Sequence, residues 1–157
     1  LNGNITLSQN KILNYVEYAT NYDENWEEIA METHRGTTDI SYSPNVVAAS
    51  TFSFYADEHM NFGVQSKYVG SQYFDNTSNQ MRKLDAYVVH NFQFEYAIPF
   101  ENSRMFRIQF IINNILDATY VSNAYGWNWY EQGDEKMERF YFPQAGINYM
   151  CKLTLDL

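Results

Sequence analysis

The last twelve residues, GINYMCKLTLDL at 146–157, constrain the fold of this chain more than any other stretch. From position 149 onward every second residue is apolar and polar residues fill the positions between, with Met150 as the one exception. The apolar set is Tyr149, Cys151, Leu153, Leu155 and Leu157. A period of two predicts a β-strand with one apolar face and one polar face.

Such a strand is unusual at the end of a soluble domain, because a long edge beside an apolar face recruits other chains. In an outer-membrane barrel the same strand would close the wall, with lipid on its apolar side and the lumen on its polar side. The remaining sequence has to distinguish these two settings.

Composition is consistent with a membrane interface and excludes one class of partner. The chain has 14 tyrosine, 11 phenylalanine and 3 tryptophan residues, so it is 18% aromatic. Tyrosine and tryptophan collect where an apolar phase meets water. An aromatic-rich soluble sheet would show the same enrichment. The formal net charge of −9 repels phosphate backbones, so nucleic acid is not an expected partner.

Any contact with a membrane has to be made by strands. No apolar run approaches the ~18 residues that a membrane-spanning helix requires. The single cysteine excludes an internal disulfide bond. The sequence carries no secretory signal and begins on Leu1, so we expect a segment of a longer protein.

Apolar alternation predicts six antiparallel strands in up-and-down order. They cover residues 3–22 (with a bulge near 8–11), 38–56, 61–74, about 91–98, about 106–112 and 146–157. The fourth and fifth are the cleanest, and with the sixth they define two expected faces. One face carries Phe92, Phe94, Tyr96, Ile98, Phe106, Ile108, Phe110, Leu153, Leu155 and Leu157, and the other carries Asn91, Gln93, Glu95, Arg107, Gln109, Thr154 and Asp156.

The lengths of the connections alternate along the chain. Long loops are expected near 23–37, 75–85 and 117–140, and short turns near 57–60 and 99–104. Outer-membrane barrels have this asymmetry, with short periplasmic turns and long outer loops. Both chain ends then fall on the short-turn side, so the pattern favours a membrane barrel over a soluble sheet.

Six strands cannot close a barrel, because the smallest barrels of this kind have eight. Either the chain is a piece of a larger wall, or two more strands lie hidden in 23–37 or 117–140. The second case would be a complete small barrel with a structural or adhesive role.

Four segments, in order along the chain, resemble the C-terminal part of TonB-dependent outer-membrane receptors. The segment NNILDATY (113–120) resembles the family signature N-L-F-D-x-x-Y, and KYVGSQYFDNTSN with RKLDAY (67–79 and 82–87) resembles the hairpin before it. The final YFPQAGINYMCKLTLDL (141–157) is similar to the last strand of the family, and NITLSQNKI (4–12) with SPNVVAAS (43–50) also fits. Two departures are Ile115-Leu116 in place of Leu-Phe, and Leu157 in place of a terminal aromatic residue.

The resemblance implies an all-β fold, the C-terminal six-strand segment of a transmembrane barrel of about 22 strands. It implies a receptor for TonB-energised uptake of a scarce solute: siderophore-bound iron, cobalamin or an oligosaccharide. The implied location is the outer membrane of a Gram-negative cell, with the C-terminus in the periplasm. Implied partners are outer-membrane lipid and lipopolysaccharide, a small-molecule ligand such as a ferric siderophore, and the TonB system. The contact with the TonB system would be made by a plug region outside these residues.

The candidate ligand-binding residues are aromatic and lie in the last expected loop. Tyr125, Trp127, Trp129 and Tyr130 could stack on the rings of a ligand or on the apolar faces of sugars. The alternative is that they form an interfacial girdle or pack within the loop.

Other chemistry is not indicated. Five carboxylates in one loop could suggest a calcium site, but their spacing is not that of an EF-hand; they are Asp23, Glu24, Glu27, Glu28 and Glu32. His34, His59 and His90 form no expected ligand set or triad, and no catalytic motif is present. We therefore expect no enzyme, cofactor or resident metal, and the alternative function is a soluble or small-barrel β-domain for carbohydrate binding or adhesion.

Overall fold

The computed structural model describes residues 1–99 and 105–156, and its architecture is all-β with antiparallel sheets. The described residues form twelve strands and one 3-10 helix, η1 (Gln80–Arg82). Within this part of the chain, no helix is both long enough and apolar enough to cross a membrane.

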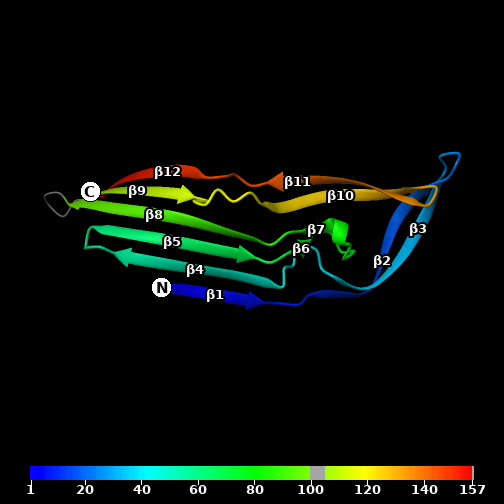
Figure 1. Ribbon diagram of the computed structural model, residues 1–157, viewed down its shortest axis with the longest axis horizontal. Coiled ribbons are helices and arrows are strands. Elements are labelled where there is room, and N and C mark those ends of the chain that lie inside the picture. Colours follow the sequence, from blue (N-terminus) through cyan, green and yellow to red (C-terminus); the bar gives the residue numbers. More distant parts are fainter. Residues whose placement is uncertain (100–104, 157) are drawn as a thin grey trace.

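Six strands form the main sheet in the order β1-β4-β5-β8-β9-β12, and each runs antiparallel to its neighbours (Figure 1). Their bounds are β1 (Asn2–Leu7), β4 (Val46–Tyr55), β5 (Met60–Val69), β8 (Tyr87–Pro99), β9 (Met105–Asn113) and β12 (Asn148–Asp156). The order of these strands in the sheet is their order in the chain, so the expected up-and-down sheet of six strands is confirmed.

The count of six strands for the whole chain is wrong, because the first and last of the expected long loops contain strands that form hairpins. The hairpin of β2 (Lys11–Tyr22) and β3 (Glu28–Asp39) includes most of 23–37, and the hairpin of β10 (Val121–Glu131) and β11 (Asp134–Pro143) includes most of 117–140. The turn between β10 and β11 has two residues, Gln132 and Gly133, with φ of 52° and 89°. Positive φ at both central positions is the geometry of a tight hairpin, which glycine makes accessible.

The expected first, second and third strands are each divided. Residues 8–10 separate β1 from β2, and the register irregularity lies between Ile12 and Val16 instead of at 8–11. Of the second, residues 38–39 belong to β3, residues 40–45 lie outside any strand, and β4 begins at Val46. The third strand ends at Val69, and a separate short strand, β6 (Gln72–Tyr73), pairs with β7 (Lys83–Leu84).

The two hairpins meet in a second sheet of order β11-β10-β2-β3. Strands β2 and β10 pair in parallel through Asn21 with Tyr130 and Tyr22 with Glu131. This parallel pair contradicts the expectation of antiparallel pairing throughout. It arises because hairpins that extend from opposite sides of the main sheet converge beyond its end (Figure 1).

The connections are sorted between the two ends of the main sheet. Residues 56–59 form a short turn that joins β4 to β5 at one end of the sheet, which we call the turn end. In this turn the Asp57 carboxylate accepts hydrogen bonds from the amides of His59 (2.7 Å) and Met60 (2.8 Å). Strand β8 ends and β9 begins at this same end, although most of the turn expected at 99–104 lies outside the described residues. Both long hairpins lie at the opposite end, the hairpin end (Figure 1).

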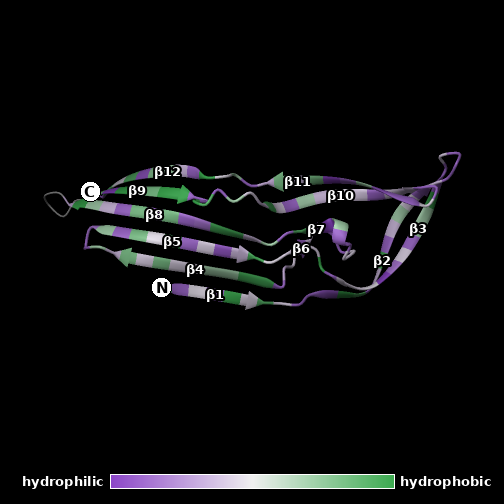
Figure 2. Cartoon of the chain, viewed as in Figure 1, coloured by the Kyte–Doolittle hydropathy of each residue, from purple (hydrophilic) through white to green (hydrophobic). Residues whose placement is uncertain are grey.

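The register confirms the two expected faces. Phe94 lies opposite Phe62 and Phe110, while Gln109 lies opposite Glu95 and Lys152. Residues paired across antiparallel strands share a face, so the apolar face runs across all six strands. Only Leu157 of the expected set lies outside the described residues. Figure 2 shows the alternation as bands of opposite hydropathy along the strands.

The apolar face of the main sheet is uncovered. Phe52, Phe54 and Leu153 expose 52%, 53% and 62% of their surface. The buried apolar cluster lies instead at the hairpin end, where Phe74, Leu84 and Ala124 pack with Val121. Among the described residues no sheet closes, and β1 and β12 are the two edges of the main sheet.

Candidate functional site

The four aromatic residues predicted to bind ligand all lie on β10, but the structure brings only three of them to one face. Tyr125, Trp127 and Trp129 alternate along the strand and therefore point to the same side. Tyr130 faces the other way and is 8% exposed. Its place is thus in the packing between the hairpins, not among the other three.

Strand β11 adds two aromatic residues that the sequence prediction missed. The ring of Phe140 lies 5.0 Å from that of Tyr125 and 5.4 Å from that of Trp127, and Phe142 lies 5.7 Å from Tyr125. These four residues form the aromatic cluster, and each is about half exposed. The alternating aromatic residues at 140 and 142 could have indicated it if 134–143 had been recognised as a strand.

A second feature of the hairpin end is a group of ion pairs centred on Arg82, which we call the ionic cluster. The guanidinium of Arg82, on η1, donates to Glu17 on β2 (2.8 Å), to Asp75 (2.7 Å) and to Glu135 on β11 (2.8 Å). Arg35 on β3 also donates to Glu17, at 2.6 and 2.8 Å. Arg82 and Glu17 are buried, so their charges depend on these partners for solvation.

Two pKa values are displaced around the ionic cluster. Burial would lower the pKa of Arg82, but the hydrogen bonds that it donates to Asp75 and Glu17 outweigh burial, so the pKa is raised. For Tyr15 burial is the main cause that raises the pKa above 10.0, and the charge of Glu17 adds to it. The cluster therefore holds Arg82 charged and Tyr15 neutral over the ordinary pH range.

The NNILDATY segment connects the main sheet to the β10–β11 hairpin. Asn114 and Asp117 both adopt positive φ, 51° and 50°, which asparagine and aspartate tolerate better than most residues. The side chain of Asn114 accepts from the amide of Ala118 and donates to the carbonyls of Ala118 and Ala145. Asp117 accepts from the amide of Ile147 at 2.8 Å. These bonds bind the two crossing segments, 114–120 and 144–147, to each other.

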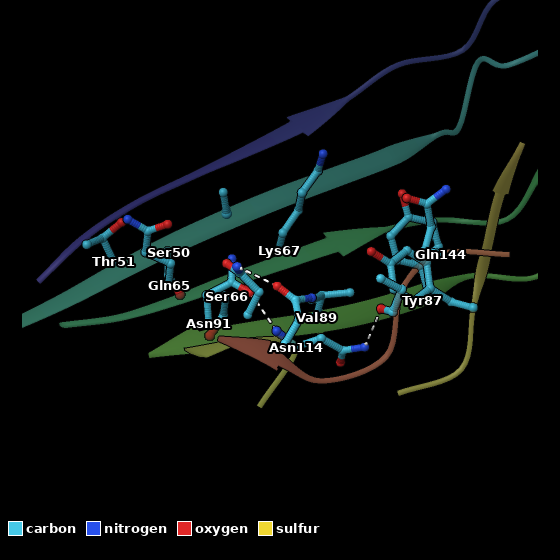
Figure 3. A pocket seen from close by; sticks show the side chains of 15 residues that line it. Ser50, Thr51, Gln65, Ser66, Lys67, Tyr87, Val89, Asn91, Asn114 and Gln144 are labelled. Atoms are coloured by element: carbon cyan, nitrogen blue, oxygen red, sulfur yellow. Dashed lines mark hydrogen bonds between the residues drawn. The ribbon is translucent and has the colours of Figure 1, made fainter. Parts of the chain in front are cut away.

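The polar face of the main sheet holds a cavity of about 500 Å³ beside these crossing segments (Figure 3). We call it the polar-face pocket. Its floor is formed by β4, β5 and β8, where Thr51, Gln65 and Asn91 are neighbours in register. Tyr120 from the crossing segment stacks on Tyr87 at 4.4 Å between ring centroids, and both line the pocket.

Amide side chains dominate the lining of the polar-face pocket. They are Gln65, Asn91, Asn113, Asn114, Gln144 and Asn148. Among the described residues of the lining, Lys67 is the one charged residue and there is no carboxylate. The sequence prediction missed this site because its residues come from five separate stretches of the chain, each unremarkable alone.

The remaining candidates do not converge. Across residues 1–99 and 105–156, no group of three histidine, cysteine, aspartate or glutamate side chains is placed to hold a metal ion. In the acidic hairpin Asp23 instead accepts from the amides of Asn25 (2.8 Å) and Glu27 (2.9 Å) and shapes the turn. His90 pairs with the hydroxyl of Ser66 at 2.7 Å, on a different strand from His34 and away from His59.

Comparisons with known proteins identify no family model, no curated protein and no solved structure that matches this chain.

Proposed function

We propose that this chain forms part of the wall of an outer-membrane receptor barrel of the TonB-dependent type. The observation that carries the proposal is the uncovered apolar face of the main sheet, which extends across all six strands. In water an apolar surface of this extent promotes association, whereas in a bilayer it is the surface that meets lipid.

Strand length supports the same setting. Strands β4, β5, β8, β9 and β12 have 10, 10, 13, 9 and 9 residues. A tilted strand needs about 9–11 residues to cross the hydrocarbon core. The hairpins at one end and the short β4–β5 turn at the other fit an outer and a periplasmic side, respectively.

The polar face would then line the lumen. It carries an ion pair of Arg107 with Asp156 at 2.6 Å, and the polar-face pocket opens on it. The resemblance of NNILDATY and of the last strand to the receptor family points to uptake of a scarce solute. Transport would be a property of the whole receptor, and residues 1–157 by themselves should transport nothing.

The alternative is a soluble β-domain for carbohydrate binding or adhesion. It requires a second layer over the apolar face of the main sheet. The second sheet continues from the hairpin end and does not cover this face within the described residues (Figure 1). The exposed rings of Phe52 and Phe54 therefore favour the membrane proposal.

Vesicle flotation tests the proposal. The full chain, refolded from denaturant in the presence of phosphatidylethanolamine–phosphatidylglycerol vesicles, should float with the lipid and remain bound after an alkaline carbonate wash. Recovery of the chain as a soluble protein in the bottom fraction would contradict it.

A further inference from the structure

We propose that the polar-face pocket is a saccharide-binding site. The inference rests on the proposed function, because it names the class of solute that the lumen side of this wall would bind. The chemistry of the pocket lining favours sugars over ferric chelates and cobalamin as that solute.

The size of the pocket suits a small oligosaccharide. Its volume of about 500 Å³ lies within the range of ligand pockets, roughly 300–1,000 Å³. A smaller cavity of about 190 Å³ continues along the same face and shares Gln65, Asn91 and Asn113 with it. The two together form an elongated site, which fits a chain of sugar units better than a single compact ligand.

The lining matches hydroxyl groups. An amide side chain both donates and accepts hydrogen bonds, as a sugar hydroxyl does, and six amides line this pocket. A ferric chelate, in contrast, has its donor oxygens engaged by the metal and presents fewer free hydroxyls. The lining formed by the described residues carries no carboxylate although the chain has 19 acidic residues, so a cationic ligand is disfavoured.

Some polar groups of the pocket lining form hydrogen bonds within the protein, and others are free to bond to a ligand. Asn113 donates to Asn148 at 2.9 Å, and Asn91 accepts from the amide of Asn114 at 2.9 Å. The side chains of Thr51 and Gln65 make no hydrogen bond within the described part of the chain. These two groups and the Asn91 amide nitrogen therefore remain to bind a ligand.

The available groups lie side by side. Thr51, Gln65 and Asn91 are paired in register across β4, β5 and β8, and Figure 3 shows all three at one end of the pocket. Neighbouring strands are about 4.8 Å apart, so the row presents hydrogen-bonding groups at a spacing comparable to the length of one sugar ring.

The other end of the pocket offers an aromatic wall. The stacked rings of Tyr87 and Tyr120 lie there together with Gln144. An aromatic ring packs against the apolar C–H face of a sugar, while the phenol hydroxyls can bond to its polar edge. Lys67 adds one positive charge, which would accept a sugar that carries a single acid group.

Calorimetric titration of the full chain in detergent micelles tests the inference. The probes are maltohexaose, chitohexaose and a galacturonate hexamer, with ferrioxamine and cyanocobalamin as comparators. We expect at least one saccharide to bind, and Gln65→Leu to weaken that binding by about fivefold or more because one ligand hydrogen bond is lost. Thr51→Val, which keeps the shape of the side chain, should weaken it in the same direction.

Gln109→Leu is the matched control. It removes the same side chain from the same face of the sheet, opposite Glu95 and Lys152, outside the pocket. We expect it to leave saccharide binding unchanged. Binding of a comparator alone, binding of no probe, or wild-type affinity in Gln65→Leu and Thr51→Val would overturn the inference.

Flotation of the same preparations separates this inference from the proposed function. A chain that floats with vesicles but binds no saccharide refutes the pocket assignment and leaves the membrane role intact. A chain that binds a saccharide but stays out of the lipid fraction supports the pocket and refutes the receptor.

Discussion

Arg82 is the residue on which the arrangement at the hairpin end depends most. Its side chain is 4% exposed and contacts carboxylates from three separate parts of the chain. Nothing in the local sequence indicates this role, because RKLDAY contains ordinary charged residues and the partners are 7, 53 and 65 positions away. Such a network becomes visible only when tertiary structure brings the groups together.

Arg82→Met should destabilise the hairpin end by about 3–5 kcal/mol, because Glu17 and Asp75 lose a buried counter-charge. The free energy is measured by urea unfolding of the chain in detergent micelles. Arg35→Met is the control, since Arg35 is 26% exposed and contacts one carboxylate, and it should cost clearly less. Equal costs for the two variants would contradict a central role for Arg82.

Asn114 has the corresponding role in the crossing segments. Asn114→Ala should cost about 2–3 kcal/mol, because it removes the side-chain bonds to Ala118 and Ala145 and places alanine at positive φ. Asn113→Ala, which removes one exposed hydrogen bond, should cost less than about 1 kcal/mol. Urea titration checks both, and a change near zero for Asn114→Ala would refute the structural role of this motif residue.

At the scale of elements, clean alternation was sufficient to predict the main sheet and both of its faces. Strands β8, β9 and β12 carry apolar residues at every second position, which fixes the register because a slip by one residue would invert the faces. The hairpin strands β3 and β11 were missed because charged residues interrupt this signal, and β10 was expected to be a loop although its aromatic residues alternate. Strand β3 reads EIAMETHRGTTD and β11 reads DEKMERFYFP, both rich in charge.

Phe94→Arg tests the facing of the strands. Phe94 lies in the middle of β8 between Phe62 and Phe110, so in a lipid-inserted barrel wall the variant should cost roughly 2–4 kcal/mol. Gln93→Arg, one residue away on the polar face, should have little effect. Unfolding titrations in lipid vesicles compare the two, and equal effects would mean that the faces do not differ in environment.

At the scale of the whole molecule, the apolar core of the described residues lies at the hairpin end. Phe74, Leu84 and Ala124 are buried at the hairpin end, whereas both faces of the main sheet remain accessible. The all-β class could be predicted from the sequence, but the polar-face pocket could not. It depends on the crossing segments 114–120 and 144–147 folding back beside β4, β5 and β8, and no periodicity encodes that.

Chain 1–157 alone in buffer should not be a stable monomer. Strands β1 and β12 leave their outer edges unpaired within the described residues, and in water an open edge beside an uncovered apolar face recruits other chains. Analytical ultracentrifugation should therefore show oligomers or aggregates without detergent. A monodisperse species at 18.5 kDa in plain buffer would support the soluble alternative.

Cys151 provides the most direct test of the claim that one face of the main sheet meets lipid. It is the chain's one cysteine, it is exposed, and it lies opposite Phe110 on the apolar face. A bimane label at Cys151 in vesicles should be quenched by doxyl-labelled lipid and protected from aqueous iodide. The same label in the double variant Cys151→Ser, Lys152→Cys should show the reverse, because position 152 lies on the polar face. Equal access of iodide to both positions would contradict a lipid-facing wall.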